Sequence, residues 1–424
     1  MNTQAVNNDQ YSESTFYCQV DTYMATKDYL RKGRCVRLIG VAPQEFFNSS
    51  LAEGVTTFTI DIDYWEFCIH DLNLKSWRQI TSEISEQINS RSDDEKRYAT
   101  WYKLEVDFKS YGAGYLYRTF SEEPPKYFSI KSLHLVLKRN LKKSGLKQNS
   151  LNVLSLASEQ INSNHPQLSS WQPNLPNTNF VFDTFHVGQG MCSLVHDEQV
   201  GFLLDVGAGK PITRSAYKAN SIKNHLRSEI DKLQTVIAVI SHSDSDHWRI
   251  LAWDSVLRNK VSAVYFPNGP ISLAMKDKAI KKKVFGLGDL TLTLSKNTTL
   301  KFLRSKPSSM DSNGNCLVTI FERDGSRVLA SGDYVYERFG TDSNSVINNL
   351  SSLKYSAVVV PHHGDAASAR NVVIPTDLAK AFFSAGTHQG YKHPTKTSLN
   401  EHKKIGFKNI SKHKKTDIIR VNLI

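Results

Sequence analysis

Apolar runs that lead into polar residues dominate the second half of the chain. Residues 180–209, FVFDTFHVGQGMCSLVHDEQVGFLLDVGAG, alternate apolar stretches with short turns, which predicts three consecutive strands. Residues 235–248 pass from an apolar strand into a polar loop, and 326–333, 356–365 and 380–394 repeat this pattern. We therefore expect an α/β fold whose strands deliver polar residues at their carboxyl ends.

The first part of the chain has a mixed pattern. Residues 55–63 alternate and are rich in β-branched side chains, which predicts a strand, whereas 75–90 carry apolar side chains at helical spacing. We expect a hairpin over 102–120, and a helix ending in a basic cluster over 131–147. These elements predict a separate α+β domain over 1–155, with binding of a protein partner as its candidate role.

Residues 156–178, LASEQINSNHPQLSSWQPNLPNT, separate the two parts. They hold three prolines and many Ser, Asn and Gln residues, but no Lys or Arg. Such a composition predicts a linker or an irregular loop. A second domain is then expected over 179–424.

Composition restricts the classes of protein. The 40% of hydrophobic residues can form a buried core, and no apolar run approaches the ~18 residues of a membrane span. The first residues lack the basic and apolar regions of a secretory signal. The five cysteines are widely spaced and odd in number, so they form neither a CxxC pattern nor a disulfide framework. We expect a cytoplasmic protein that does not contact membranes.

The net charge of +12 is unevenly distributed. Residues 1–178 hold 20 basic and 20 acidic residues, whereas 179–424 hold 33 and 21. The excess is either a solvated surface or a means of attracting a polyanion such as nucleic acid. The candidate phosphate contacts are Lys281, Lys282, Lys283, Arg370 and Lys392.

Metal-competent side chains are concentrated after the apolar strands. His242, Asp244, Asp246 and His247 fall within six residues, directly after a strand. If the loop is extended, alternate residues point the same way, so the first three side chains converge and the fourth reaches a second metal position. Later strands add further donors at their ends: Asp333, His362, His363, His388 and His393. A polar loop with incidental histidines does not account for this repetition, so the sequence predicts a metal site.

The order of these motifs resembles a known family. FHVGQG, LLDVG, SHSDSDH, SGD, VPHHG and SAG…HP occur in the order found in the metallo-β-lactamase fold. The match is nearest to the ComEC/Rec2-type metallohydrolase domain, which belongs to the DNA-uptake branch, and it covers residues 180–424. The resemblance implies an αββα sandwich of two mixed sheets with a dinuclear metal site at one edge.

The resemblance also implies roles for individual residues. It gives the first metal His242 and Asp244, the second metal Asp246 and His247, and both metals the bridging carboxylate of Asp333. His393 is the expected last histidine ligand, and the other late histidines remain alternatives: His362, His363 and His388. Asp205 is expected to orient ligands from behind the metal loop. Catalysis is expected to involve Asp246, with His362 or His393 as proton donor to the leaving alkoxide.

The chain departs from the family pattern at four places. Asp244 stands where the usual fold signature has histidine, although the look-alike branch shares the aspartate. Trp248-Arg249 replaces a small glycine-containing turn, and Asp365 replaces a serine. The middle histidine ligand is missing, and its strand offers Asn315 and Cys316 instead. Cys316 is expected to be a small buried core residue, with metal binding as the alternative.

The resemblance and the charge together predict a metal-dependent phosphodiesterase. Two divalent ions lower the pKa of water to about 7, so hydroxide is available to cleave nucleic acid. The expected ions are Zn²⁺ or Mn²⁺, with Mg²⁺ a further alternative. DNA is favoured over RNA by analogy, as is a soluble effector of antiviral defence. The alternatives are a hydrolase of a small substrate, such as a cyclic nucleotide, lactone or thioester, and a catalytically weak binding module.

Overall fold

The structure is a computed structural model that divides into two compact units. Among the described residues, those of 14–136 form the first unit and those of 158–424 form the second. The structure describes residues 14–22, 35–48, 57–71, 101–109, 112–118, 126–136, 158–161, 179–219, 222–272, 280, 282–307, 314–386, 393–411 and 417–424. The helix expected over 75–90 lies outside these residues.

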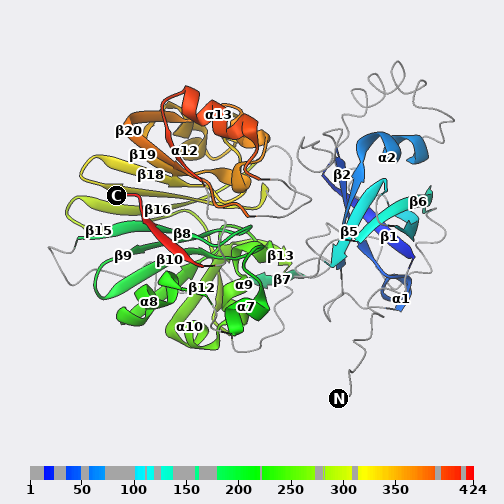
Figure 1. The fold of residues 1–424 in the computed structure, drawn as a ribbon, viewed down its shortest axis with the longest axis horizontal. Helices are drawn as coiled ribbons and strands as arrows, with labels where there is room; N and C mark the ends of the chain where they lie inside the picture. The colour runs from blue at the N-terminus through cyan, green and yellow to red at the C-terminus, as the bar shows by residue number, and fades with distance from the viewer. Residues whose placement is uncertain are drawn as a thin grey trace. The chain divides into compact units, whose positions relative to one another are not determined.

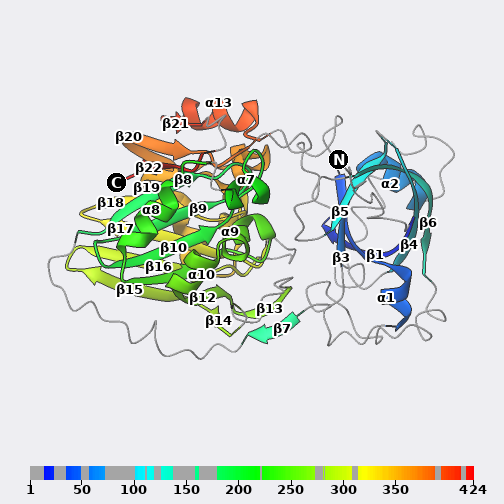
Figure 2. The ribbon, with the colours of Figure 1, turned by 60° about the horizontal axis from the view of Figure 1, so that its bottom comes forward.

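The first unit contains a closed antiparallel barrel (Figure 2). Its strands are β1 (Thr15–Thr22), β2 (Cys35–Val41), β3 (Thr57–Asp63), β4 (Tyr102–Phe108), β5 (Gly114–Arg118) and β6 (Lys126–Leu135). Where the structure describes this unit, two helices accompany the strands, α1 (Pro43–Asn48) and α2 (Tyr64–Asp71). The strand order is β1-β2-β3-β5-β6-β4, and alternate apolar side chains such as Phe16, Leu38 and Ile60 form the barrel interior.

Two expectations for the first unit are wrong. The strands expected as a hairpin over 102–120 are present, but β4 and β5 do not pair, because β6 lies between them. Residues 131–135, the start of the helix expected over 131–147, belong to strand β6, and residues 137–147 lie outside the described residues. Both errors concern β6, which follows β5 directly in the chain and pairs with β5 on one side and with β4 on the other.

The second unit contains two seven-stranded sheets. The first comprises β8 (Val181–His186), β9 (Cys192–His196), β10 (Val200–Val206), β11 (Thr235–Val239), β12 (Val261–Pro267), β14 (Val284–Leu287) and β22 (Ile419–Asn422), in the order β14-β12-β11-β10-β9-β8-β22. The second runs in chain order: β15 (Leu290–Ser295), β16 (Thr298–Arg304), β17 (Leu317–Arg323), β18 (Ser326–Ala330), β19 (Lys354–Val359), β20 (Ile374–Phe382) and β21 (Lys408–Ile410). The strands predicted from the apolar runs are confirmed.

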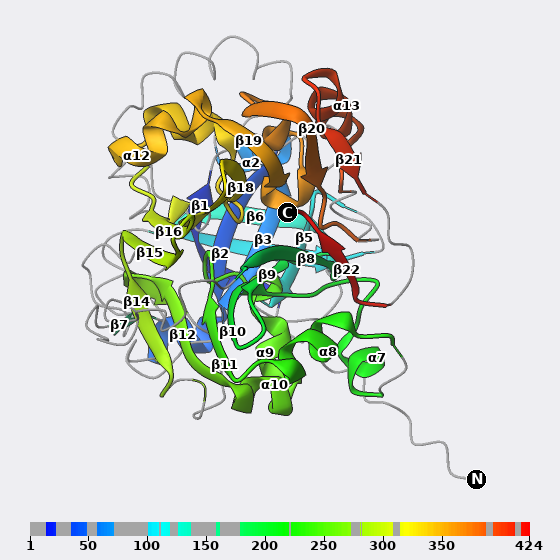
Figure 3. The same ribbon diagram turned by 90° about the vertical axis from the view of Figure 1, so that its left-hand side faces the viewer.

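Helices cover the outer faces of both sheets (Figures 1 and 3). Beside the first sheet lie α7 (Arg214–Lys218), α8 (His225–Lys232), α9 (Arg249–Trp253) and α10 (Ser255–Lys260). Beside the second lie α12 (Ser345–Asn348) and α13 (Lys396–Lys404). The 3₁₀ turns are η4 (Ser245–His247), η6 (Tyr336–Thr341), η7 (Asn349–Ser352), η8 (Pro361–Gly364) and η9 (Ala367–Ala369). Among the described residues, no helix has the length and apolar character required to span a membrane.

A continuous apolar core joins the inner faces of the two sheets. Phe182 and Phe202 from the first sheet belong to the same buried cluster as Phe302, Phe321 and Phe382 from the second. A second cluster lies between the outer face of the second sheet and its helices. Because both inner faces are apolar and wholly buried, the strand ends are fixed relative to one another.

Residues in the stretch expected as a linker form a strand. β7 (Ser158–Ile161) pairs with β13 (Gly269–Ser272) in a two-stranded sheet of the second unit. The other end of the unit is also paired, since β22 lies antiparallel to β8. Asp183 accepts hydrogen bonds from Arg420 and Asn422 there, and so secures β22.

The parallel portions of the two sheets position the polar loops. In the first sheet, β10, β11, β12 and β14 are parallel, and in the second so are β18, β19, β20 and β21. Since the carboxyl ends of parallel strands meet at one edge of a sheet, the loops after β18, β19 and β20 are neighbours. The loop after β11 meets them across the core, where Leu317 donates to the Ser241 carbonyl.

A buried histidine in α13 makes the stability of the second unit depend on pH. His402 is fully buried, its Nδ1 lies 2.8 Å from the Ser398 carbonyl and its Nε2 lies 3.3 Å from the Tyr336 hydroxyl. Burial lowers the pKa of His402 from 6.5 to about 4, against weaker opposing effects of the Ser398 carbonyl and Glu401. In the unfolded chain the same imidazole takes up a proton near pH 6.5.

We predict that the wild-type protein loses about 2 kcal/mol more of its free energy of unfolding than His402→Gln between pH 7 and pH 5. As the pH falls, the unfolded chain binds a proton before the folded chain does, so the equilibrium shifts towards unfolding. Urea denaturation of both proteins at the two pH values measures the difference. Equal losses would contradict the prediction.

Candidate metal centre

The metal loop follows β11 and changes conformation halfway along. His242 and Asp244 precede η4, a 3₁₀ turn that contains Asp246 and His247. The expectation of an extended loop is therefore wrong at 245–247: the turn directs the second pair of donors to another side of the loop. Met191 donates its backbone N–H to the Asp246 carbonyl at 3.1 Å, which attaches the loop to the segment that follows β8.

A first group of donors surrounds one oxygen of Asp333. Oδ2 of Asp333 lies 3.6 Å from His242 Nε2 and 3.6 Å from His362 Nε2. Oδ2 of Asp244 lies 3.6 Å from the same His242 nitrogen. Two imidazoles and the carboxylate of Asp244 thus lie on one side of Asp333.

A second group surrounds the other oxygen. Oδ1 of Asp333 lies 3.2 Å from His247 Nε2 and 3.8 Å from His363 Nε2. Oδ2 of Asp246 lies 3.0 Å from the His363 nitrogen. Asp333 therefore stands between two groups of the same composition, each with two histidines and one further aspartate.

Each of these histidines is held through its other ring nitrogen. Nδ1 of His247 lies 2.9 Å from Asp205 Oδ2, and Nδ1 of His362 lies 2.8 Å from Asp365 Oδ2. Nδ1 of His363 lies 2.9 Å from the Ser384 carbonyl. With an acceptor at Nδ1, the neutral ring carries its proton there and presents the Nε2 lone pair to Asp333.

Ser241 extends the same arrangement to His242. Its hydroxyl donates to Asp205 at 2.9 Å and lies 3.1 Å from the Nδ1 atoms of His242 and His247. Since the hydroxyl proton is directed to Asp205, the serine oxygen accepts from His242. Asp205 also accepts the Ser241 backbone N–H at 2.6 Å, so it fixes both the start of the metal loop and two of its rings.

The donor set fits divalent cations. Within the described residues, the Nε2 atoms of His242, His247 and His363 and Oδ1 of Asp333 are buried and have no hydrogen-bond partner. Buried polar atoms without partners are costly, and each of these can donate a lone pair to a cation. Two overlapping sets of three donors, which share His247, also lie close enough to hold an ion: His242, His247 and Asp333, and Asp246, His247 and His363. The mixture of imidazole and carboxylate suits Zn²⁺ or Mn²⁺.

The electrostatics of the site show how strongly these groups interact. Burial lowers the pKa of His247, but Asp205 and Asp333 outweigh it and raise that pKa well above its ordinary value. Burial raises the pKa of Asp333, but the surrounding histidines hold it well below its ordinary value. Cation binding must displace protons from such imidazoles, so metal uptake releases protons and weakens as the pH falls.

The backbone after β19 adopts a rare conformation that directs two rings into the site. His362 and His363 have φ values of 49° and 56°, in the left-handed region, and Gly364 follows at 79°. A non-glycine residue held there costs about 1–3 kcal/mol and persists only where its surroundings enforce it. Here the His362 N–H donates to the Gly332 carbonyl at 3.1 Å, and Asp365 and Ser384 hold the rings.

The remaining predicted residues lie around this centre or away from it. His393 is buried with its ring centroid 6.1 Å from that of His363. Lys283 donates to two backbone carbonyls, of Arg258 and Val261, and Arg370 pairs with Glu337 at 3.0 Å. Lys282 is exposed. Three predicted residues lie outside the described ranges: Lys281, His388 and Lys392.

The departures from the family pattern have local explanations. Cys316 is fully buried, and its thiol donates to the Ser331 carbonyl at 3.3 Å, while burial raises its pKa far above the ordinary value. A neutral thiol engaged in this way agrees with its expected place in the core. Trp248 is buried and donates its indole N–H to the Ser243 carbonyl at 2.8 Å, which closes the metal loop.

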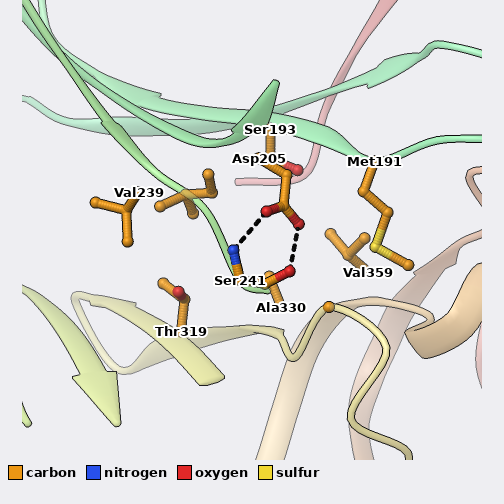
Figure 4. A pocket seen from close by; sticks show the side chains of 10 residues that line it. Met191, Ser193, Asp205, Val239, Ser241, Thr319, Ala330 and Val359 are labelled. Carbon is orange, nitrogen blue, oxygen red and sulfur yellow. Dashed lines mark hydrogen bonds between the residues drawn. The ribbon is translucent and has the colours of Figure 1, made fainter. Parts of the chain in front are cut away.

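The interior side of the centre has little free space. A small cavity between the sheets, with room for about one water molecule, lies behind Asp205 and Ser241 (Figure 4). Apolar side chains contribute to its wall: Met191, Leu204, Val239, Ala330 and Val359. Such surroundings strengthen the attraction between the carboxylates and any cation they bind.

Sequence reasoning did not identify three of the groups that hold the histidines. Ser241 precedes the metal motif, but serine in a loop is too common to indicate a role. Ser384 acts through its backbone carbonyl, which every residue type has, so its identity as serine gives no indication of the role. Asp365 was noted only as a departure from the family pattern. Its position two residues after His363 could have indicated that it holds a histidine ring.

Comparisons with known proteins give structural neighbours and no sequence match. No family model and no curated protein matches the chain. It is similar to the metallo-β-lactamase fold protein YhfI from Bacillus subtilis, with 14% identity and a TM-score of 0.33 over 57% of this chain and all of that one. It is also similar to a mutant of CmlA β-hydroxylase, with 11% identity and a TM-score of 0.34 over 58% of this chain and 55% of that one. A third similar structure is human tRNase Z, short form, with 8% identity and a TM-score of 0.25 over 42% of this chain and 76% of that one. Because these TM-scores lie below 0.5, the neighbours do not indicate the chemistry of this chain, which must be inferred from its own side chains.

We predict that Asp205→Asn lowers metal affinity about 10- to 100-fold. The substitution removes the charge that orients His247 and the start of the metal loop, but retains the shape of the side chain. Calorimetric titration of the metal-free protein with Zn²⁺ or Mn²⁺ measures the change. Asp377→Asn, at an exposed carboxylate in β20, is the control for loss of charge alone, and a similar effect of both variants would contradict the prediction.

We predict that Gly207→Ala destabilises the second unit by about 1–3 kcal/mol and weakens metal binding. A Cβ at Gly207 would collide with the backbone carbonyl of Asp246, so the metal loop must move. Gly340→Ala is the matched control, because its Cβ would meet nothing within 4 Å. Thermal denaturation and metal titration of the two variants test this, and unchanged metal affinity in Gly207→Ala would count against the loop displacement.

Proposed function

We propose that this chain is a two-metal phosphodiesterase that cleaves nucleic acid, with DNA favoured over RNA. The observation that carries the proposal is the position of Asp333, each of whose oxygens faces its own group of two histidines and one aspartate. On this proposal the second unit is an αββα sandwich of the metallo-β-lactamase type, nearest to the ComEC-type branch. The two apolar-faced sheets and their outer helices support that assignment.

The residues of the centre have separable tasks. Bound divalent ions supply a nucleophile, by lowering the pKa of water, and neutralise charge on a phosphoryl group. Asp333 spans the two positions, and Asp244 and Asp246 each add one carboxylate to one position. Asp205 and Asp365 fix the rings of His247 and His362 before substrate arrives. Such preorganisation is what two-metal catalysis requires of the protein.

The metals that we propose are Mn²⁺ or Zn²⁺, with Mg²⁺ a weaker candidate. The two groups together offer four imidazoles and three carboxylates. Asp244, in a position that the usual fold signature gives to histidine, makes one group richer in oxygen, and oxygen ligands favour Mn²⁺ over Zn²⁺. Four imidazoles are more nitrogen than Mg²⁺ prefers.

Charge supports a polyanionic substrate. The net charge of +12 arises entirely from residues 179–424, the part of the chain that contains the metal centre. Two divalent ions would add positive charge at the centre itself. Both features attract phosphodiester polymers and make binding sensitive to salt. We further propose that the protein is a cytoplasmic nuclease with a role in defence, which agrees with a polyanionic substrate.

We predict that Asp246→Ala abolishes phosphodiester hydrolysis but leaves binding of nucleic acid largely intact. Asp246 is a donor of the second group, so its loss should raise the barrier by several kcal/mol. Affinity for the polymer instead depends on Lys and Arg side chains spread over the unit. Cleavage of circular and linear DNA and RNA, with Mn²⁺, Zn²⁺ or Mg²⁺ in turn, is compared with binding at two salt concentrations.

Asp377→Asn serves as the control for a lost surface carboxylate. Cleavage by Asp246→Ala at the parent rate would refute the role of the centre. A folded wild-type protein that binds two ions and cleaves a cyclic nucleotide, but no polymer, would redirect the proposal to a small substrate.

A further inference from the structure

The late histidine His393 differs from the other four in the group that its Nδ1 contacts. Nδ1 of His393 lies 3.2 Å from Nε2 of Gln189, the amide nitrogen of that side chain. The other four histidines direct Nδ1 at oxygen atoms: a serine hydroxyl, two carboxylates and a backbone carbonyl. An amide nitrogen only donates, whereas those oxygens accept.

The orientation of the Gln189 amide is set by a second contact. The Gly386 backbone N–H donates to Oε1 of Gln189 at 3.5 Å, on the side opposite the histidine. If the amide were reversed, its NH₂ group would face the Gly386 N–H, and two donors would oppose each other. The amide oxygen therefore faces Gly386, and the amide nitrogen faces His393.

The amide determines the tautomer of His393. Because Gln189 donates to Nδ1, that nitrogen must be unprotonated, and the neutral ring carries its proton on Nε2. A protonated Nε2 has no lone pair for a metal ion.

The position of His393 places this proton beside the metal centre. Its ring lies nearly parallel to that of His363, with centroids 6.1 Å apart, and 5.9 Å from the ring of His362. Both of those rings contribute to the groups around Asp333. Neither of the three-donor sets found among the described residues includes His393.

We propose that His393 binds an anionic substrate oxygen, such as a phosphoryl oxygen, through Nε2–H, and that it is not a metal ligand. Gln189 is the positioning residue that holds this tautomer. With its proton on Nε2, the ring acts as a hydrogen-bond donor to that oxygen. This assignment rests on the metal centre of the proposed function and replaces the expected ligand role of His393.

Three variants separate the roles. His393→Gln removes the ring, and His363→Gln is the control that removes a proposed ligand of similar burial. Gln189→Glu keeps the shape of the side chain but places a carboxylate oxygen opposite Nδ1, which would move the proton from Nε2 to Nδ1. Circular dichroism and thermal denaturation establish that each variant is folded.

Two measurements do not depend on activity. The number of Zn²⁺ ions bound per chain is obtained by elemental analysis and calorimetric titration of wild type, His393→Gln and His363→Gln. The tautomer is obtained from long-range ¹H–¹⁵N NMR correlations of the metal-free and Zn²⁺-loaded full-length protein, with His393→Gln identifying the signals of that ring. The third measurement is cleavage of DNA, for which removal of a donor to a developing oxyanion costs about 100- to 1,000-fold in kcat.

The expected result is that His393→Gln binds as many Zn²⁺ ions as wild type, whereas His363→Gln loses one. The His393 signals should show Nε2–H in both states of the wild type and Nδ1–H in Gln189→Glu. Loss of an ion in His393→Gln, or a wild-type His393 ring protonated on Nδ1, would overturn the inference. If neither DNA nor RNA is cleaved by the wild type, the proposed function fails, while the metal count and the tautomer still decide the role of His393.

Discussion

The second unit depends on a buried carboxylate with histidines on both sides. Asp333 is almost fully buried, and a charged group at that depth is stable only beside compensating positive charge. Its two oxygens face different histidine pairs, so the compensation must come from two positions. This requirement explains why loops from both sheets converge there: the donors follow β11, β18 and β19, which belong to different layers of the fold.

The groups that hold the histidine rings determine the chemical role of each ring as much as the histidines themselves do. An imidazole can bind a cation, accept a proton or donate one, and the atom opposite Nδ1 selects among these states. Asp205, Asp365 and the Ser384 carbonyl select a free lone pair at Nε2, whereas the amide of Gln189 selects a proton there. Neighbouring histidines thus have two different chemical roles, and a single glutamine is sufficient to produce the second role.

From the sequence we could predict which side chains converge. We could not predict as well which groups hold these side chains in place. Apolar runs that end in His or Asp are local features, so the strands of the second unit and the donors at their ends could be predicted. The extended form of the metal loop was wrong, because a 3₁₀ turn over 245–247 is stabilised by contacts such as that between Met191 and Asp246, which are remote in sequence. The β4–β5 hairpin was wrong because β6, the next strand in the chain, lies between β4 and β5 and pairs with both. The tautomer of His393 depends on the orientation of an amide, which no residue pattern encodes.

The pairing of β22 with β8 has a consequence for synthesis of the protein. Asn422 donates to Asp183 across 239 residues of chain, and β22 completes one edge of the first sheet. On the ribosome, β8 emerges long before its partner, so the sheet cannot reach its final form until translation has passed β22. The donors of the metal centre all lie between these two strands in the chain. A chain made in this order completes the edge of its first sheet only after every donor of the metal centre has already been translated.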